Sequence, residues 1–181
     1  MYFYLPSQNK GTIKINELDQ NEKDKKEINN NPKNVFTNTE FITQDKNGQT
    51  NITRAKESYT AQNQPDLINL RHVYSFTKLK KDQSLIEINS DKGFYNKKNK
   101  EIKYEGSVKI KNKHYLIEAN SAQHLFFDNL IIINGNVIMK DINDEIRHVI
   151  YCDTVEINTI TNNAVAFMQN KNTKVISKKL K

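Results

Sequence analysis

The sequence predicts an all-β protein in which antiparallel hairpins stack in series and form two facing sheets. Apolar and polar residues alternate with a period of two through most of residues 36–177, as in strands that have one buried face. One hairpin pattern is written twice, over residues 85–110 and 116–139, and each copy returns through Gly-x-Val. This region lacks the spacing of an amphipathic helix. A repeated hairpin without helices predicts a serial stack of strands.

The first 34 residues differ from the rest in composition. Residues 1–6 read MYFYLP, far fewer than the roughly 20 apolar residues that a membrane-spanning helix needs. We expect them to be the remnant of an N-terminal membrane segment. Residues 7–34 are rich in Asn, Lys, Glu, Asp and Gln. Because such a segment buries little apolar surface, we expect a poorly ordered linker.

A single folded domain is expected over residues 35–177. Its first hairpin turns at Asn47-Gly48, a pair that accepts positive φ at low cost. Residues 52–76 repeat the hairpin pattern more weakly. A fourth copy starts at residue 149 and turns at Asn162-Asn163. A short strand over 174–177 then precedes a basic tail, 178–181.

The alternation also predicts which side chains face the interior. In residues 102–111 the even positions are apolar and the odd ones polar, so one face of the sheet is buried and the other is solvated. Gly106 and Gly135 fall on the inward parity, where they mark either bends in the strands or space for a ligand. The residues expected to face the interior are Ile52, Tyr59, Tyr74, Phe76, Ile86, Ile88, Phe94, Tyr104, Val108, Ile110, Ile117, Phe126, Ile133, Val137 and Met139.

Composition and motifs exclude several kinds of function. Cys152 is the only cysteine, so there is no internal disulfide, and its place among apolar residues predicts a buried, inert thiol. No metal-binding motif, cofactor-binding loop or nucleophile–base motif is present, so we expect no metal, no cofactor and no enzymatic activity. The net charge of +7 is compatible with an anionic partner such as a nucleic acid, an anionic lipid or a phosphorylated glycan.

The repeat resembles a known family. The Asn-Ser pairs near the start of each copy, the aromatic pairs that follow, and the returns Gly106-Ser107-Val108 and Gly135-Asn136-Val137 are similar to the OstA/LptA-like β-jellyroll of lipopolysaccharide transport proteins. Within that group, the order of short apolar N-terminus, polar linker and single open β-jellyroll most resembles the LptC family. The resemblance covers residues 36–177.

The resemblance implies a function without catalysis. Such proteins lie in the periplasm, anchored in the inner membrane by an N-terminal helix. They accept lipopolysaccharide from an inner-membrane ABC exporter of the LptB, LptF and LptG type and pass it to LptA. The interior residues above would then be lipid-binding. Lys78, Lys80, Lys109 and Lys111 are candidates for phosphate contacts. The C-terminal edge, with Ala164, Val165, Ala166, Phe167 and Val175, would pair with the LptA-like partner by strand addition.

Three alternatives stay open at this point. The first is that the chain is an LptA-like soluble bridge. The second is a structural β-scaffold whose core is filled by side chains, because an apolar stripe on strands is most often core. A nucleic-acid-binding β-protein fits the charge but is less favoured, since most aromatic residues share the parity of the aliphatic ones, whereas base stacking needs exposed aromatics.

Overall fold

The computed structural model describes residues 13–14, 32–45, 47–61, 63–142, 148–169 and 174–179. None of these residues is helical; accordingly, the described part of the chain contains no helix able to cross a membrane. The all-β class predicted from the sequence is confirmed. The strands are β1 (Ile13–Lys14), β2 (Pro32–Gln44), β3 (Thr50–Ala61), β4 (Leu67–Lys78), β5 (Leu85–Asn96), β6 (Glu101–Lys111), β7 (Tyr115–Leu125), β8 (Leu130–Asp141), β9 (His148–Asn158), β10 (Ala164–Phe167) and β11 (Ile176–Lys179).

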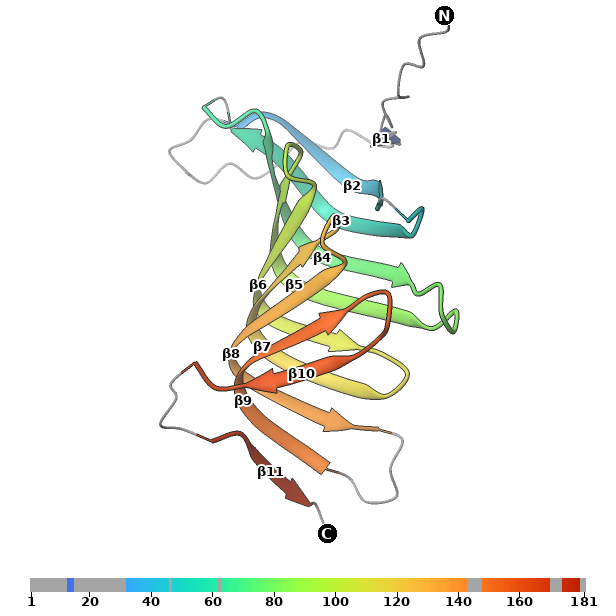
Figure 1. Ribbon diagram of the computed structural model, residues 1–181. Coiled ribbons are helices and arrows are strands. Elements are labelled where there is room, and N and C mark those ends of the chain that lie inside the picture. The colour runs from blue at the N-terminus through green and yellow to red at the C-terminus, as the bar shows by residue number, and fades with distance from the viewer. Residues whose placement is uncertain are drawn as a thin grey trace, which may run out of the picture.

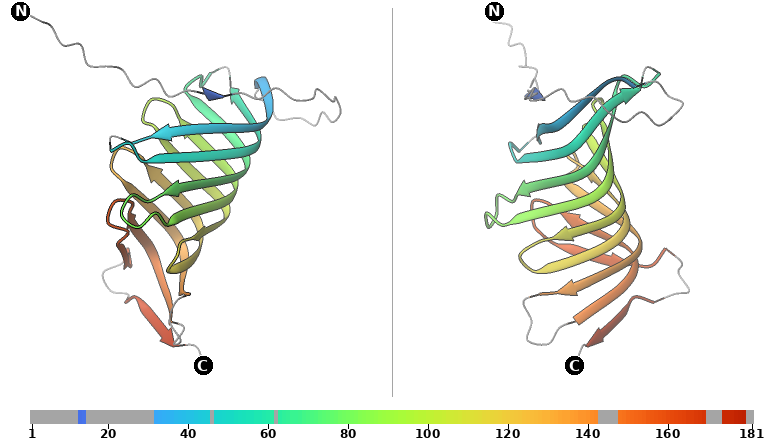
Figure 2. Two further views of the ribbon diagram at one scale, coloured as in Figure 1. Left: turned by 90° about the vertical axis from the view of Figure 1, so that its right-hand side faces the viewer. Right: turned by 180° about the vertical axis from the view of Figure 1, so that it is seen from behind.

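The strands form one antiparallel sheet in sequence order from β1 to β10, with β11 also paired to β9. Every connection between the long strands is therefore a hairpin, as the repeat predicted. Figures 1 and 2 show that this single sheet curls along its length, so that the two ends of each long strand approach each other. The two expected facing sheets are thus the two halves of one bent sheet.

The bend is built from irregularities at the middle of successive strands. The register shifts between Asn89 and Lys92 in β5, and at the corresponding points of β6, β7 and β8. Bulges of this kind bend a strand and increase its twist. In β2 and β4 the same line is marked by Asn38 and His72, whose φ angles are +52° and +50°. The fold is therefore encoded by a row of local defects in the pairing.

Gly106 and Gly135 belong to this row of bulges. Their φ values are +76° and +81°, which residues with a Cβ adopt only at a cost. A Cβ on Gly106 would lie 2.8 Å from the Asp91 carboxylate, and one on Gly135 would lie 2.9 Å from the Asn120 amide nitrogen. The interpretation of these glycines as bends is confirmed. The space beside them is occupied by polar side chains of the neighbouring strand.

The bend divides the sheet into two walls. The first wall comprises residues 39–44, 50–55, 73–78, 85–90, 108–111, 115–119, 137–141 and 148–152, together with β11. The second wall comprises residues 57–61, 67–71, 92–96, 101–105, 121–125, 130–134 and 154–158, together with β10.

Side chains from the two walls meet in the interior. The hydroxyl of Tyr104 on the second wall donates a hydrogen bond of 2.9 Å to Ser75 Oγ on the first. The rings of Phe41 and Tyr95, also from opposite walls, have centroids 5.9 Å apart. Most apolar residues between the walls are less than 5% exposed. The interior is therefore packed by side chains over most of its length.

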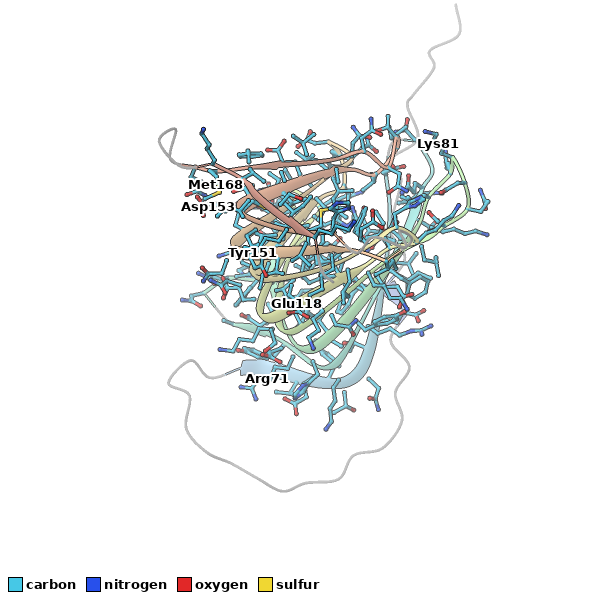
Figure 3. The ribbon with its side chains drawn as sticks, turned by 90° about the horizontal axis from the view of Figure 1, so that it is seen from below. Arg71, Lys81, Glu118, Tyr151, Asp153 and Met168 are labelled. Carbon is cyan, nitrogen blue, oxygen red and sulfur yellow. The ribbon has the colours of Figure 1, made fainter. Side chains whose placement is uncertain are left out.

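The turns of the two walls also touch along the open side. Asn47 Nδ2 donates to Asn129 Oδ1 at 3.2 Å, and Lys81 Nζ donates to the Thr161 carbonyl at 3.4 Å. In Figure 3, Lys81 lies at the turns, on the opposite side of the molecule from Arg71 and Asp153 near the bend. These contacts are exposed, so each adds little stability.

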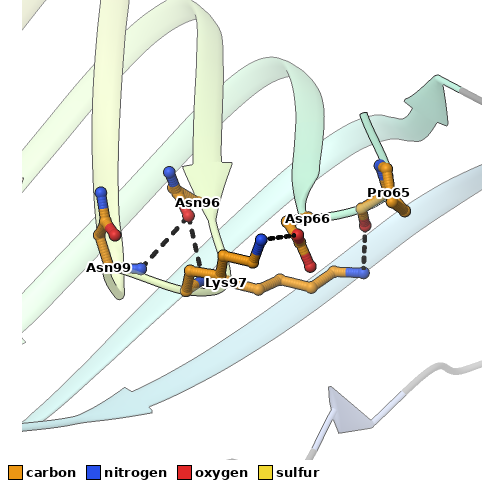
Figure 4. A network of polar contacts seen from close by, with 6 residues as sticks. Pro65, Asp66, Asn96, Lys97 and Asn99 are labelled. Atoms are coloured by element: carbon orange, nitrogen blue, oxygen red, sulfur yellow. Dashed lines mark hydrogen bonds and ion pairs between the residues drawn. The ribbon is translucent and has the colours of Figure 1, made fainter. Parts of the chain in front are cut away.

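Neighbouring turns of the second wall are tied to each other as well. Figure 4 shows Lys97 Nζ donating to the Pro65 carbonyl at 2.9 Å and Lys98 paired with Asp66 at 2.8 Å. The Asn96 side chain accepts hydrogen bonds from backbone N–H groups of the turn that follows it, including that of Asn99 at 3.3 Å. The ion pair raises the pKa of the Lys98 ammonium. Lys97 and Lys98 therefore connect neighbouring turns.

The C-terminal edge of the sheet has an unusual construction. β10 pairs with residues 154–157 of β9 and β11 pairs with residues 148–151, and both run in the same direction. Together they cover β9 as one strand would, interrupted at the bend. β10 packs Ala164 and Ala166 against the core, whereas all four residues of β11 are exposed.

The first long strand, β2, begins at Pro32, three residues before the expected start of the folded domain. Residues 1–6, the expected membrane remnant, lie outside the described residues, as does most of the expected linker 7–34. Within that linker, β1 pairs with Phe41 and Glu40 of β2. The last strand, expected over 174–177, is β11 and takes in the first two residues of the expected basic tail. The tight turn at Gly48 is present, held by Asp45 Oδ1, which accepts from Asn47 N and Gln49 N at 2.8 and 2.7 Å.

Candidate functional site

From β5 onward, two rows of paired interior positions are mostly aliphatic. On the first wall, one continuous row of paired inward positions crosses the sheet from β5 to β9: Ile88, Ile110, Ile117, Met139 and Ile150. The second wall offers a matching row of paired positions: Tyr104, Ala122, Ile133, Val155 and Ala166. The residues of both rows belong to, or pack against, one buried apolar cluster.

On the first wall, the interior also contains a group of polar side chains from β3 and β4. Thr77 Oγ1 donates to Asn51 Oδ1 at 2.7 Å, and Asn51 Nδ2 donates to Thr53 Oγ1 at 3.0 Å. Thr53 Oγ1 and Ser75 Oγ lie 2.6 Å apart. All four residues are less than 5% exposed. Buried polar groups are tolerated when they satisfy one another, and this network does so.

Tyr104 joins the polar network to the opposite wall. Its side chain is completely buried, and desolvation raises the pKa of its phenol. The hydroxyl donates to Ser75 on β4, the residue that pairs with Ile88 on β5. Tyr104 therefore crosses the interior and links the second wall to the hydroxyl groups of β3 and β4.

A cavity of about 370 Å³ opens at the C-terminal end of this apolar interior, within the range typical of ligand pockets. Tyr115, Met139, Ile150 and Ala164 supply its apolar lining. Its polar residues are His114, Asp141, His148, Asn162 and Asn163. Asn162 Oδ1 accepts hydrogen bonds from Asn112 Nδ2 at 3.0 Å and from Tyr115 Oη at 3.4 Å. The two walls are thus linked beside the cavity by one asparagine.

Two further titratable groups are buried in the sheet. His124 is 2% exposed, lies 4.2 Å from the Phe126 ring between centroids, and leaves its Nδ1 without a hydrogen-bond partner. Desolvation lowers its pKa to about 3, so the imidazole is neutral. Cys152 is buried, and desolvation raises the pKa of its thiol, which agrees with the predicted inert cysteine.

Ten of the residues predicted to face the interior do so. Each is buried in the apolar core, or packs against it in the case of Met139. They are Ile86, Ile88, Tyr104, Val108, Ile110, Ile117, Phe126, Ile133, Val137 and Met139.

The interior position expected of Ile52, Tyr59, Tyr74, Phe76 and Phe94 is wrong: these residues lie on the outer face. For the last three, the irregularity at the bend reverses the inward parity, so even positions face inward before it in β5 and outward after it. In β3 the positions that face the interior hold small or polar residues, and Ile52 and Tyr59 lie between them on the outer face.

The outer face covers these side chains with charged groups. The Arg54 guanidinium lies 5.5 Å from the centroid of the Phe76 ring, and that of Arg71 lies 5.9 Å from Tyr59. Tyr74 Oη donates to Glu87 Oε2 at 3.0 Å. Cation–π contacts of this kind shield aromatic surface at exposed sites. The predicted phosphate-contacting lysines are all exposed, and Lys109 and Lys111 alternate with buried residues of β6, so they also point outward.

The predicted partner edge lies at the end of the sheet. Ala164–Phe167 form β10, with Val165 59% and Phe167 37% exposed, and Val175 directly precedes β11. Among the described residues, β10 has no second strand partner. An open edge of this kind is available for strand addition.

Sequence reasoning missed part of the cavity. Ile150, Tyr115 and Asn162 line it, yet none was assigned to the interior. Ile150 shares parity with Cys152, and its pairing with Met139 follows from the hairpin repeat. The interior position of Ile150 could therefore have been predicted from the sequence. The cavity depends on how the turn at Asn162 meets the first wall, which no local pattern records.

The described residues contain no cluster of three or more side chains able to bind a metal ion. No protein-family model matches the chain, and no curated protein matches its sequence.

Proposed function

We propose that this protein is an LptC-like component of lipopolysaccharide transport. In this role its jellyroll lies in the periplasm, attached to the inner membrane by an N-terminal helix. It accepts lipopolysaccharide from an inner-membrane ABC exporter of the LptB, LptF and LptG type and passes it to an LptA-like partner. The acyl chains lie between the two walls, and no step requires a catalytic residue or a cofactor.

The observation that carries this proposal is the apolar interior between the walls, which opens at the cavity beside Met139 and Ile150. Each buried methylene stabilises a bound chain by about 0.8 kcal/mol. A bent open sheet allows the walls to separate around a cargo, because contacts between their turns, such as those of Asn47 with Asn129 and of Lys81 with Thr161, are polar and exposed. The unpaired edge of β10 supports docking of a like-folded partner.

A structural β-scaffold is the second candidate, favoured by the packed interior. Its core residues are almost fully buried as they stand. A scaffold needs no access to these residues, whereas a carrier must expose them when cargo enters. The two functions therefore differ in whether an interior substitution affects lipid binding independently of stability.

The test compares two isoleucines of the first wall. Ile150→Asn places a polar group in the cavity, whereas Ile52→Asn makes the same change on the outer face. Titration with fluorescently labelled lipopolysaccharide should show a Kd about tenfold weaker for Ile150→Asn, equivalent to about 1.4 kcal/mol, and little change for Ile52→Asn. Urea unfolding of both variants controls for stability. Absence of saturable binding by the wild-type protein favours the scaffold.

A further inference from the structure

Lysines gather on the outer face of the first wall between β6 and β11. Strand pairing places two rows of residues there, which alternate along each strand with buried core residues such as Ile110 and Ile117 and therefore point outward. One row is Lys109, Glu118, Ile138, Tyr151 and Ile176, and the other is Lys111, Leu116, Lys140, Val149 and Lys178. These residues, which include four lysines and one glutamate, are called the basic face below.

The outer face of the second wall has the opposite balance of charge on the same strands. Its two matching rows contain one lysine and two glutamates: Lys103, Gln123, Ile132, Glu156 and Val165, and Glu105, Ser121, Asn134, Thr154 and Phe167. Lys103 is also paired with Glu105 at 2.6 Å. Because β6 to β9 contribute to both faces, the high lysine content of the chain as a whole does not account for the difference.

Apolar side chains lie between the lysines of the basic face. Ile176 and Tyr151 are 52% and 37% exposed, and the Lys178 ammonium lies 5.3 Å from the centroid of the Tyr151 ring. Only Lys140 is paired with the glutamate of this face, at 3.5 Å from Glu118. A surface of this composition suits a bilayer, because its apolar groups enter the headgroup region while the ammonium groups stay beside the lipid phosphates.

We propose that the basic face docks on the surface of an anionic bilayer, with the strands of the first wall lying parallel to the membrane. Its rows cross five strands, a width of about 20 Å. Nucleic acid fits this face less well, because base stacking needs several exposed rings and Tyr151 is the only aromatic residue among the ten. The proposal goes beyond lipid carriage, which uses the inward side of the same wall.

Co-sedimentation of the full chain with vesicles tests the role of the lysines. The wild type should bind vesicles made of equal parts phosphatidylcholine and phosphatidylglycerol, less tightly as salt is added, and should not bind phosphatidylcholine alone. The variant Lys109→Gln, Lys111→Gln, Lys178→Gln should bind at least about tenfold more weakly. Circular dichroism checks that it is folded. Absence of wild-type binding, or equal binding to both kinds of vesicle, would overturn the proposal.

The matched control removes the same charge from other parts of the sheet. Lys56, Lys92 and Lys103 are exposed and lie outside the basic face. The variant Lys56→Gln, Lys92→Gln, Lys103→Gln should keep the wild-type affinity for anionic vesicles. Equal losses in the two triple variants would show that only net charge matters, and would contradict docking through one face.

An introduced tryptophan tests which wall meets the membrane. The chain contains no tryptophan, so a single indole reports only its own surroundings. Tyr151→Trp places it on the basic face and Phe167→Trp on the outer face of the second wall, and the two replaced residues are equally exposed, at 37%. Anionic vesicles should shift the emission of Tyr151→Trp to shorter wavelength and leave that of Phe167→Trp unchanged.

Three outcomes of the fluorescence experiment would overturn the proposal. A shift from both variants would mean that no single wall docks, and a shift from Phe167→Trp alone would assign docking to the second wall. Binding of a DNA duplex as tight as that of the vesicles, with no shift from Tyr151→Trp on either, would assign the lysines to nucleic acid.

Discussion

Single residues determine the chemistry of the interior. Thr53, Ser75 and Tyr104 bring three hydroxyl groups together where the two walls meet, and the hydrogen bond from Tyr104 to Ser75 joins the walls. His124 adds a buried imidazole to the second wall, with an unpartnered Nδ1. Gly106 and Gly135 adopt positive φ angles at the bend. Each has a measurable consequence for stability.

His124 should make the protein less stable in acid. Its pKa in the folded protein is about 3, against about 6.5 in the unfolded chain. Between these values the unfolded state binds more protons, so the free energy of unfolding falls as the pH drops from about 6.5 towards 3. Urea unfolding should show that the wild type loses about 2 kcal/mol more than His124→Leu between pH 7 and pH 5. Equal losses in the two proteins contradict a buried neutral imidazole.

Substitution of Gly106 should weaken the bend. Gly106→Ala forces a Cβ into a positive φ and to within 2.8 Å of the Asp91 carboxylate, at an expected cost of about 1–3 kcal/mol. Asn136→Gly is the control, because it keeps positive φ accessible and should change the free energy of unfolding by less than about 1 kcal/mol. Chemical denaturation of both variants measures the difference, and equal stabilities would argue against strain at Gly106.

At the scale of elements, alternation predicted the strands but assigned some faces wrongly. Residues 102–110 keep one inward parity because the bulge contains two residues, Gly106 and Ser107, both with positive φ. An even number of residues leaves the alternation of faces unchanged on the two sides of the bulge. β4 and β5 reverse parity at the bend. Phe76 and Phe94, which a constant parity assigns to the interior, therefore lie on the outer face. A bulge is a property of strand pairing, and without a glycine to mark it the local sequence does not show where parity changes.

The two C-terminal strands should contribute unequally to stability. Deletion of residues 174–181 removes β11, which buries no side chain, and the loss should be small. Deletion of residues 164–181 also removes Ala164, Ala166 and Met168 from the core and uncovers β9, so its cost should be several-fold larger. The urea midpoints of both truncations test this. If docking of an LptA-like partner uses the β10 edge, a pull-down should lose the partner when residues 164–181 are deleted.

At the scale of the whole molecule, the described residues form one curled sheet whose two walls enclose a shared apolar interior. A repeated hairpin indicated this architecture, since each unit buries one face against its neighbours. The contacts between turns, such as Asn47 with Asn129 and Asn112 with Asn162, join residues far apart in the chain. Sequence periodicity carries no information about such contacts, which is why the cavity was not predicted.

The most direct test of lipid carriage is photo-crosslinking from one interior and one exterior position. A benzophenone amino acid is placed at Ile150, which lines the cavity, or at Ile52, which lies on the outer face of the same wall. The protein is then irradiated in cells that synthesise lipopolysaccharide. We expect lipopolysaccharide adducts from Ile150 and none from Ile52. No adduct from Ile150, or equal adducts from both positions, would contradict a lipid path between the walls.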